Sequence, residues 1–245
     1  MRTLAIANQK GGVGKTTTAV TLAADLARKG YITVLCDLDA QGNAAACLGL
    51  SPAPALRKLL MGMARLEDLL IEARPGLWFL AGDVTTARLK IELLAEGDPK
   101  TLLARALEPL ECDFVVLDCG PSRDLLHDLA HHAAGEVVIP TACDFLAVAG
   151  VGQEMETLKI VRQDGHPIEA RAVLPTFWDS QTIESRTNLQ ALADAFGPLV
   201  LPAVPRTTRL RELPAIGQTV WERLPEDSPV CEAYARLTRR VLDGQ

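Results

Sequence analysis

The chain lacks several features that would assign it to whole classes of protein. It has no apolar run near the roughly 18 residues needed to span a bilayer, and because its first residues run directly into an apolar stretch we expect no targeting segment. We therefore expect a cytoplasmic protein. The cysteines never form a C-x-x-C pair, which argues against a disulfide framework and indicates reduced thiols at Cys36, Cys47, Cys112, Cys119, Cys143 and Cys231.

An excess of positive charge is also missing. The formal net charge is −6, whereas a domain that reads a DNA sequence is usually basic. This argues against that class of protein but leaves room for a local basic patch. Internal repeats and low-complexity segments are absent as well. What remains is a chain of 245 residues, 48% hydrophobic, which suits one α/β domain spanning residues 1–245.

Short apolar runs alternate with amphipathic stretches along most of the chain. The runs predict strands at residues 3–8, 32–36, 77–80, 114–118, 136–140, 168–174 and 199–204. Helices are predicted at 16–29, 84–95, 99–110, 181–196 and 225–242, among others, and one or two short helices in an insert at 51–75. This order predicts a mostly parallel sheet of seven or eight strands with helices on both faces.

A glycine-rich loop between the first strand and the first helix is the strongest motif. Three glycines within residues 11–14 leave the backbone free to curl its N–H groups around an anion, at the positive end of a helix. Lys15 would neutralise the β- and γ-phosphates and Thr16 would ligate Mg²⁺. The predicted phosphate loop comprises Lys10, Gly11, Gly12, Val13, Gly14, Lys15, Thr16 and Thr17.

This loop departs from the ordinary phosphate-loop pattern at its first glycine, where the chain has Gln9. A second lysine, Lys10, follows instead. Because Lys15 already serves the phosphates of its own loop, Lys10 is better placed to reach a nucleotide held by a second subunit. The loop thus resembles the deviant Walker A motif of the ParA/MinD family of dimerising ATPases, and the resemblance to ParA/Soj-type partition ATPases covers nearly the whole chain.

Acidic residues follow two of the predicted strands. The segment from Asp37 to Asn43 resembles the family's D-x-D-P-Q-G-N motif, with Ala40 in place of proline. By that resemblance Asp39 is the catalytic acid that orients the attacking water, and Asp37 lies nearer the Mg²⁺ ion. Asp118 ends an apolar strand, as in a Walker B motif, and a buried carboxylate there needs a cation. The expected metal-site residues are Thr16, Asp37, Asp39 and Asp118.

Two later segments resemble the part of the family that surrounds the adenine base. The first contains Pro175, Thr176 and Phe177, and Phe177 is a candidate to pack on the base, although a core role is equally open. The second begins with Pro205 and Arg206, which in the family help to wall the adenine pocket.

The segment after Asp118 contains other chemistry-bearing residues. His127 and His131 have the i, i+4 spacing of a metal site. For these two and for His132, however, we favour a solvated or interfacial helix face. Cys119 is interpreted as a small residue beside the Walker B strand and not as a cluster ligand.

The resemblance implies a slow, Mg²⁺-dependent ATPase in which ATP bridges a homodimer and Lys10, Lys15 and Asp39 are catalytic. It also implies a ParB-like activator and non-specific DNA binding in partition of plasmid or chromosomal DNA at the nucleoid. Candidate DNA contacts are Arg186, Arg209, Arg211 and Arg223, for which pairing with nearby acids is an equal alternative. Two other functions remain open: positioning of a protein cargo, or membrane-associated regulation of division as in MinD. The last helix lacks a lysine-rich face, so we expect it to dock in the core and expect no membrane binding.

Overall fold

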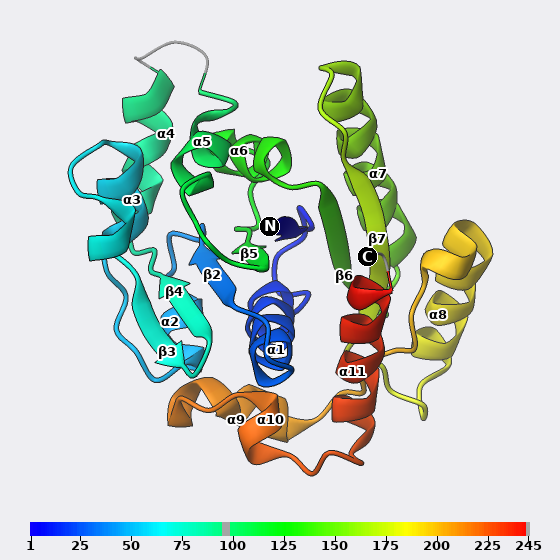
Figure 1. The fold of residues 1–245 in the computed structure, drawn as a ribbon. Coiled ribbons are helices and arrows are strands. Elements are labelled where there is room, and N and C mark those ends of the chain that lie inside the picture. Colours follow the sequence, from blue (N-terminus) through cyan, green and yellow to red (C-terminus); the bar gives the residue numbers. More distant parts are fainter. Residues whose placement is uncertain (95–98, 244–245) are drawn as a thin grey trace.

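The computed structural model describes residues 1–94 and 99–243, and its centre is a seven-stranded sheet in the order β3-β4-β2-β5-β1-β6-β7 (Figure 1). All neighbouring strands are parallel except β3 and β4. The strands are β1 (Arg2–Ile6), β2 (Thr33–Asp37), β3 (Ile71–Arg74), β4 (Leu77–Leu80), β5 (Phe114–Asp118), β6 (Glu136–Ala142) and β7 (Glu169–Thr176). The prediction of a mostly parallel α/β sheet is therefore confirmed.

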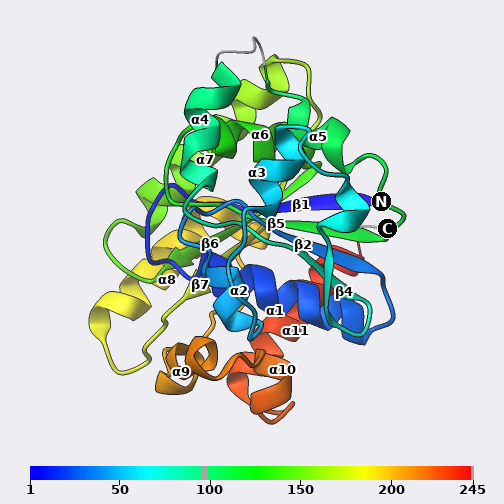
Figure 2. The same ribbon diagram turned by 90° about the vertical axis from the view of Figure 1, so that its left-hand side faces the viewer.

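Helices cover both faces of this sheet. Seen edge-on in Figure 2, α1, α10 and α11 lie on one side, whereas α4, α5 and α6 lie on the other. Every residue of β2 and β5 is buried, as expected for apolar strands covered on two faces. The helices are α1 (Lys15–Arg28), α2 (Asn43–Cys47), α3 (Ala55–Leu60), α4 (Thr86–Leu94), α5 (Leu102–Leu107), α6 (Leu125–Ala133), α7 (Ala147–Gln163), α8 (Ile183–Phe196), α9 (Thr208–Ile216), α10 (Val220–Arg223) and α11 (Pro229–Leu242), with short 3₁₀ turns at Leu66–Asp68 and Gly197–Leu199.

One predicted strand is wrong, and one strand of the sheet was not predicted. The expected strand at 199–204 does not form and makes only isolated bridges, Val173 with Val200 and Trp178 with Pro205. Pro198, Pro202 and Pro205 lie in or beside this stretch, and proline has no N–H to donate to a ladder. The seventh strand is instead β3, at the end of the 51–75 insert, where only short helices were expected.

The strand β3 forms a hairpin with β4. The turn between them contains Gly76, whose φ of 74° favours glycine, and a register shift falls between Glu72 and Arg74. Short helices do occur earlier in the insert, at α3 and the 3₁₀ turn. The helix boundary expected at Gly97 and Asp98 lies outside the described residues.

The last helix, α11, docks in the core as expected. Tyr234, Leu237 and Val241 are buried where α11 packs against α1, and the Tyr234 hydroxyl lies 3.5 Å from the hydroxyl of Thr18. Within the described residues, no helix combines the length and apolar character required to cross a membrane.

The carboxyl ends of the parallel strands gather the motifs at one edge of the sheet. Asp37 ends β2 and Asp118 ends β5, and the two residues are register partners. Ile6, at the end of β1, is a partner of Asp118 on the other side, so the glycine loop starts beside both acids. Ligands of open α/β sheets bind at this edge.

Candidate nucleotide and magnesium site

The glycine loop joins β1 to α1. Two of its glycines have a positive φ, 72° at Gly12 and 85° at Gly14, and Gly14 directly precedes α1. The Lys15 side chain is buried and turns back over the loop, where its Nζ donates to the Lys10 carbonyl at 2.9 Å. Burial lowers the pKa of Lys15, and the charge of Asp118 acts in the opposite direction. The loop thus holds one ammonium group at its centre, among backbone N–H groups that suit a phosphate.

Asp37 and Asp118 form a buried acidic pair beside this ammonium group. Asp37 accepts hydrogen bonds from the N–H groups of Asp39 at 3.0 Å and Ala44 at 3.2 Å. Neither carboxylate oxygen of Asp118 has a hydrogen-bond partner among the described residues. Burial raises the pKa of Asp37 to about 7, and burial together with the charge of Asp37 raises that of Asp118.

The donor set of this pair fits Mg²⁺. Two carboxylates converge, and among residues 1–94 and 99–243 no cationic side chain forms an ion pair with Asp118. The Thr16 hydroxyl is near enough to lower the pKa of Asp118. Hard oxygen ligands of this kind are those that Mg²⁺ binds, commonly through water. A divalent cation would also remove the cost of two adjacent buried negative charges.

Asp39 lies on the rim of a cavity of about 160 Å³. It is partly buried, its Oδ1 accepts from the Gln41 N–H at 3.0 Å, and a Cβ at Gly120 would lie 3.7 Å from its carboxyl carbon. Asp39 and Gly120 both line the cavity, and a side chain at Gly120 would be in van der Waals contact with the Asp39 carboxylate. Such a carboxylate can accept a proton or orient a water molecule.

Lys10 points away from Lys15. Its Nζ lies 2.5 Å from Oδ2 of Asp144, and its N–H donates to the Asn8 side chain at 2.9 Å. Asp144 precedes two exposed apolar residues, Phe145 and Leu146. The motif did not reveal Asp144, because it lies far away in the chain and acids are common after strands.

The two late segments lie side by side at the same edge. Thr176 is buried and its Oγ1 lies 2.9 Å from the Val13 carbonyl, so the end of β7 touches the glycine loop. The Arg206 N–H donates to the Trp178 carbonyl at 2.8 Å, which brings Pro205 and Arg206 beside Phe177. Pro175 is at the end of β7 in the same segment.

Phe177 has a positive φ of 53° and is partly exposed. Positive φ is uncommon outside glycine and costs on the order of 1–3 kcal/mol, so such residues cluster at ligand sites. The ring would lie 3.9 Å from a Cβ at Gly14, which places it next to the loop.

Comparison with known proteins identifies the family. Residues 1–169 match the family described as an AAA domain. The chain is 38% identical to the chromosome-partitioning ATPase Soj of Thermus thermophilus, over 99% of this chain and 96% of that protein. The chain belongs to the ParA/Soj family. Another relative, the chromosome partitioning protein ParA of Caulobacter vibrioides, is 36% identical over 100% of this ATPase and 95% of its own length.

Solved structures agree with this ParA/Soj-type fold. The complex of Cyanothece McdA with ATP superimposes with a TM-score of 0.89 at 24% identity, covering 99% of this chain and 96% of that one. A Mycobacterium smegmatis protein named cobyrinic acid a,c-diamide synthase, with bound ADP and magnesium, has a TM-score of 0.84 at 32% identity, covering 99% and 94%. The present protein is an ATPase that uses ATP and Mg²⁺.

The four arginines suggested as DNA contacts are all exposed in this ParA/Soj-type ATPase, and no ion pair involves them within the described residues. Glu222, one of the acids considered as their partner, pairs with Arg74 at 2.6 Å instead. Arg209 and Arg211 lie on α9 and Arg223 on the adjoining α10, whereas Arg186 lies on α8, apart from these helices in Figure 1.

The predicted solvated or interfacial histidine face of α6 is wrong. His127, His131 and His132 are all buried, because α6 packs against α5, α7 and β1. A residue that sequence reasoning missed, Glu154 of α7, contacts two of them. No motif marks Glu154, and only the packing of α7 on α6 brings it there. Cys119 is buried beside Asp118, as expected.

Proposed function

We propose that this ParA/Soj-type ATPase is a single-domain, ATP-dependent dimerising switch for the partition of plasmid or chromosomal DNA. Two copies would associate face to face around two ATP molecules and separate after hydrolysis. The observation that carries this proposal is the outward position of Lys10, which lies at the rim of the site and not over its own phosphate loop.

The geometry described above supports the following roles within one subunit. The backbone from Gly11 to Thr17 and the ammonium of Lys15 would bind the phosphates. Thr16, Asp37 and Asp118 would hold Mg²⁺, which is supported by the absence of any hydrogen-bond partner for the Asp118 oxygens in the part of the chain that the structure describes. Mg²⁺, when bound, supplies positive charge to the phosphate oxygens. The base would lie at Phe177, with Pro175, Thr176, Pro205 and Arg206 around it.

The dimer face would include the surface around Lys10. A surface depression of about 380 Å³ is lined by Lys10, Pro121, Arg123 and Leu146, among others. Phe145 next to it has 85% of its surface exposed, which favours burial against a second copy. In the dimer Lys10 would leave Asp144 and reach the partner's phosphates, where a cation stabilises the charge of the transition state.

Hydrolysis itself would depend on Asp39. Its partly exposed carboxylate lines the cavity of about 160 Å³, which supports a role in aligning the attacking water. Loss of the γ-phosphate would then remove the group that both subunits bind, and the dimer would loosen.

Non-specific DNA binding by the ATP-bound dimer would rest on local positive charge, because the net charge is −6. Arg209, Arg211 and Arg223 are exposed on adjoining helices and lack acidic partners within the described residues, which supports a role for them and, on α8, for Arg186. A ParB-like protein would stimulate hydrolysis, and the ATP-bound form would be nucleoid-associated.

A single experiment tests the dimer switch. Lys10→Ala should bind ATP but stay monomeric in light scattering, and its hydrolysis rate should fall by about 10³-fold or more, as on loss of an arginine finger. Lys159→Ala, which removes an exposed lysine on α7, is the control. Normal hydrolysis by Lys10→Ala would refute the role across the subunit boundary.

A second experiment tests the proposed role in DNA partition. Binding to DNA is measured with ATP, with ADP and without nucleotide, and ATP-dependent binding would distinguish DNA partition from the cargo and membrane alternatives.

A further inference from the structure

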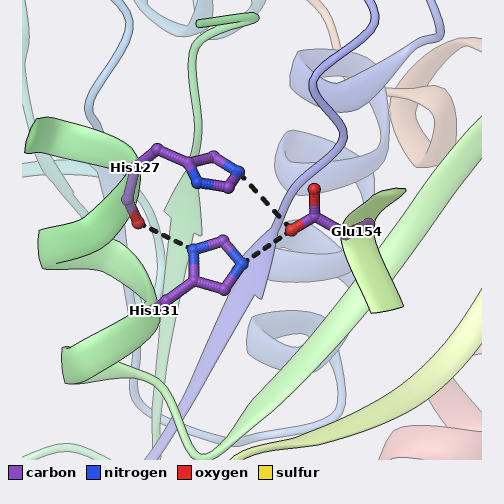
Figure 3. A group of neighbouring side chains, drawn as sticks. All are labelled: His127, His131 and Glu154. Carbon is purple, nitrogen blue, oxygen red and sulfur yellow. Dashed lines mark hydrogen bonds and ion pairs between the residues drawn. The ribbon is translucent and has the colours of Figure 1, made fainter. Parts of the chain in front are cut away.

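Three buried side chains between α6 and α7 have no part in the proposed ATPase cycle. His127 and His131 are one helical turn apart on α6, and Glu154 faces both of them from α7 (Figure 3). Their exposed fractions are 2%, 0% and 0%. Buried ionisable groups destabilise a fold unless they are paired or bind a metal, so each polar atom of the three side chains needs a partner.

The contacts of His131 define its tautomer. Its Nδ1 lies 2.7 Å from the backbone carbonyl oxygen of His127, and because a carbonyl only accepts, Nδ1 carries a hydrogen. Its Nε2 lies 2.6 Å from Oε1 of Glu154. Both of these atoms carry lone pairs, so the contact needs a proton or a metal cation between them.

The other two side chains have unsatisfied atoms. Within the described part of the chain, neither ring nitrogen of His127 has a hydrogen-bond partner, and neither does Oε2 of Glu154. The His127 Nε2 lies 3.4 Å from Oε1 of Glu154, and in Figure 3 both rings turn toward this carboxylate. A buried polar atom without a partner destabilises the fold, so this cluster favours an additional bound group.

We propose that His127, His131 and Glu154 bind a divalent transition metal ion of the zinc type. Two imidazole nitrogens and a carboxylate oxygen are an established zinc ligand set, and here one ligand atom from each residue lies within 4.8 Å of the others. Bonds of about 2.0–2.1 Å in a tetrahedral site separate ligand atoms by roughly 3.3 Å. The contact of 3.4 Å already fits, and the contact of 2.6 Å would open by roughly 0.7 Å.

The surroundings also suit a metal. The hydrogen bond from Nδ1 of His131 to a backbone carbonyl is the outer contact that metal-binding histidines usually make. His127 also lines the cavity of about 160 Å³ that Asp39 and Cys119 line, so one of the three ligand residues borders space in which water could lie. The metal ion would displace the proton between His131 and Glu154, so its affinity should rise with pH.

The test uses the whole chain. Bound metal and nucleotide are first removed, and excess Mg²⁺ is then added so that it occupies the acidic pair near the phosphate loop. Co²⁺ is titrated and followed by its visible absorption, and Zn²⁺ is titrated by calorimetry. We expect one ion per chain, with proton release and without a thiolate-to-cobalt charge-transfer band. His127→Gln and Glu154→Gln should each weaken binding by at least about 100-fold, the upper range for loss of an outer-shell partner.

His132→Gln is the matched control. It removes a buried histidine from the same helix whose Nδ1 contacts the Asp128 carbonyl, outside the cluster. Absence of binding by the wild type, unchanged binding by both cluster variants, or equal loss in His132→Gln would overturn the proposal. If the cluster variants fail to fold, X-ray absorption of the zinc-loaded wild type decides: two imidazoles without sulfur support the site, and any other ligand set contradicts it.

Discussion

Lys10 and Asp144 form an ion pair of 2.5 Å although they are 134 residues apart in the chain. The pair holds the Lys10 ammonium at the rim of the phosphate loop, while the Lys15 ammonium occupies its centre. Two lysines separated by five positions therefore point in different directions. In the proposed dimer, Lys10 would leave Asp144 to reach the second subunit, so the ion pair would compete with that contact.

The first prediction is that Asp144→Asn favours the ATP-bound dimer. The side chains of the pair are 28% and 39% exposed, so the pair is worth at most about 1 kcal/mol, which corresponds to a factor of about five. Asparagine keeps the acceptor for the Leu146 N–H but removes the charge that competes for Lys10. Light scattering against protein concentration, with unhydrolysed ATP, measures the change.

The control for this change is Glu156→Gln, which removes the acid of an exposed ion pair with Lys159. It should leave the dimer affinity as in the wild type. A weaker dimer in Asp144→Asn would show that Asp144 positions Lys10 for the second subunit and does not compete with it.

The second prediction concerns pH and Asp37. Burial raises its pKa from 3.8 to about 7, so between these values the folded protein binds a proton that the unfolded chain releases. Without Mg²⁺, the free energy of unfolding should therefore fall as pH rises from about 4 to 7, by up to about 4 kcal/mol from this group. Urea unfolding across this range measures the slope.

Asp37→Asn supplies the comparison for that slope. The variant cannot ionise at this position. Its free energy of unfolding should therefore fall less than that of the wild type as pH rises. Excess Mg²⁺ should reduce the fall in the wild type alone. A pH dependence identical in the two proteins would contradict the raised pKa.

The third prediction is that Arg211→Ala weakens binding to random-sequence DNA and lowers the salt dependence. Each phosphate contact contributes about 0.9 to the slope of log affinity against log salt. Fluorescence anisotropy at several salt concentrations, with ATP present, measures the slope for the wild type, Arg209→Ala, Arg211→Ala and Arg223→Ala. Unchanged slopes in all three variants would show that these arginines of α9 and α10 do not contact DNA.

The fourth prediction is that Leu237→Ala destabilises the fold by about 2–5 kcal/mol, because this side chain is fully buried where α11 packs on α1. Arg239→Ala, an exposed change in the same helix, should alter stability by no more than about 0.5 kcal/mol. Denaturant unfolding gives both values. Equal stability of the two variants would mean that α11 is not docked.

The sequence by itself determined that the glycine loop and two acidic residues lie together at one edge of the sheet, and the order of the elements around them. The loop from Lys10 to Thr17, and the acids Asp37 and Asp118 at strand ends, are predictable because short-range spacing and the parallel sheet place them at one edge. The docking of α11 was predictable too, from its apolar stripe.

Only the tertiary structure decided the rest. The stretch at 199–204 does not form a strand whereas β3 does, His127 and His131 are buried against Glu154, and Lys10 pairs with Asp144. The strand β3 depends on pairing with β4 across a turn, and the histidine and lysine contacts depend on which distant segment packs alongside. A local pattern records the preference of a segment but not the identity of its neighbour, and it is the neighbour that supplies the hydrogen bonds, the opposite charge and the exclusion of water.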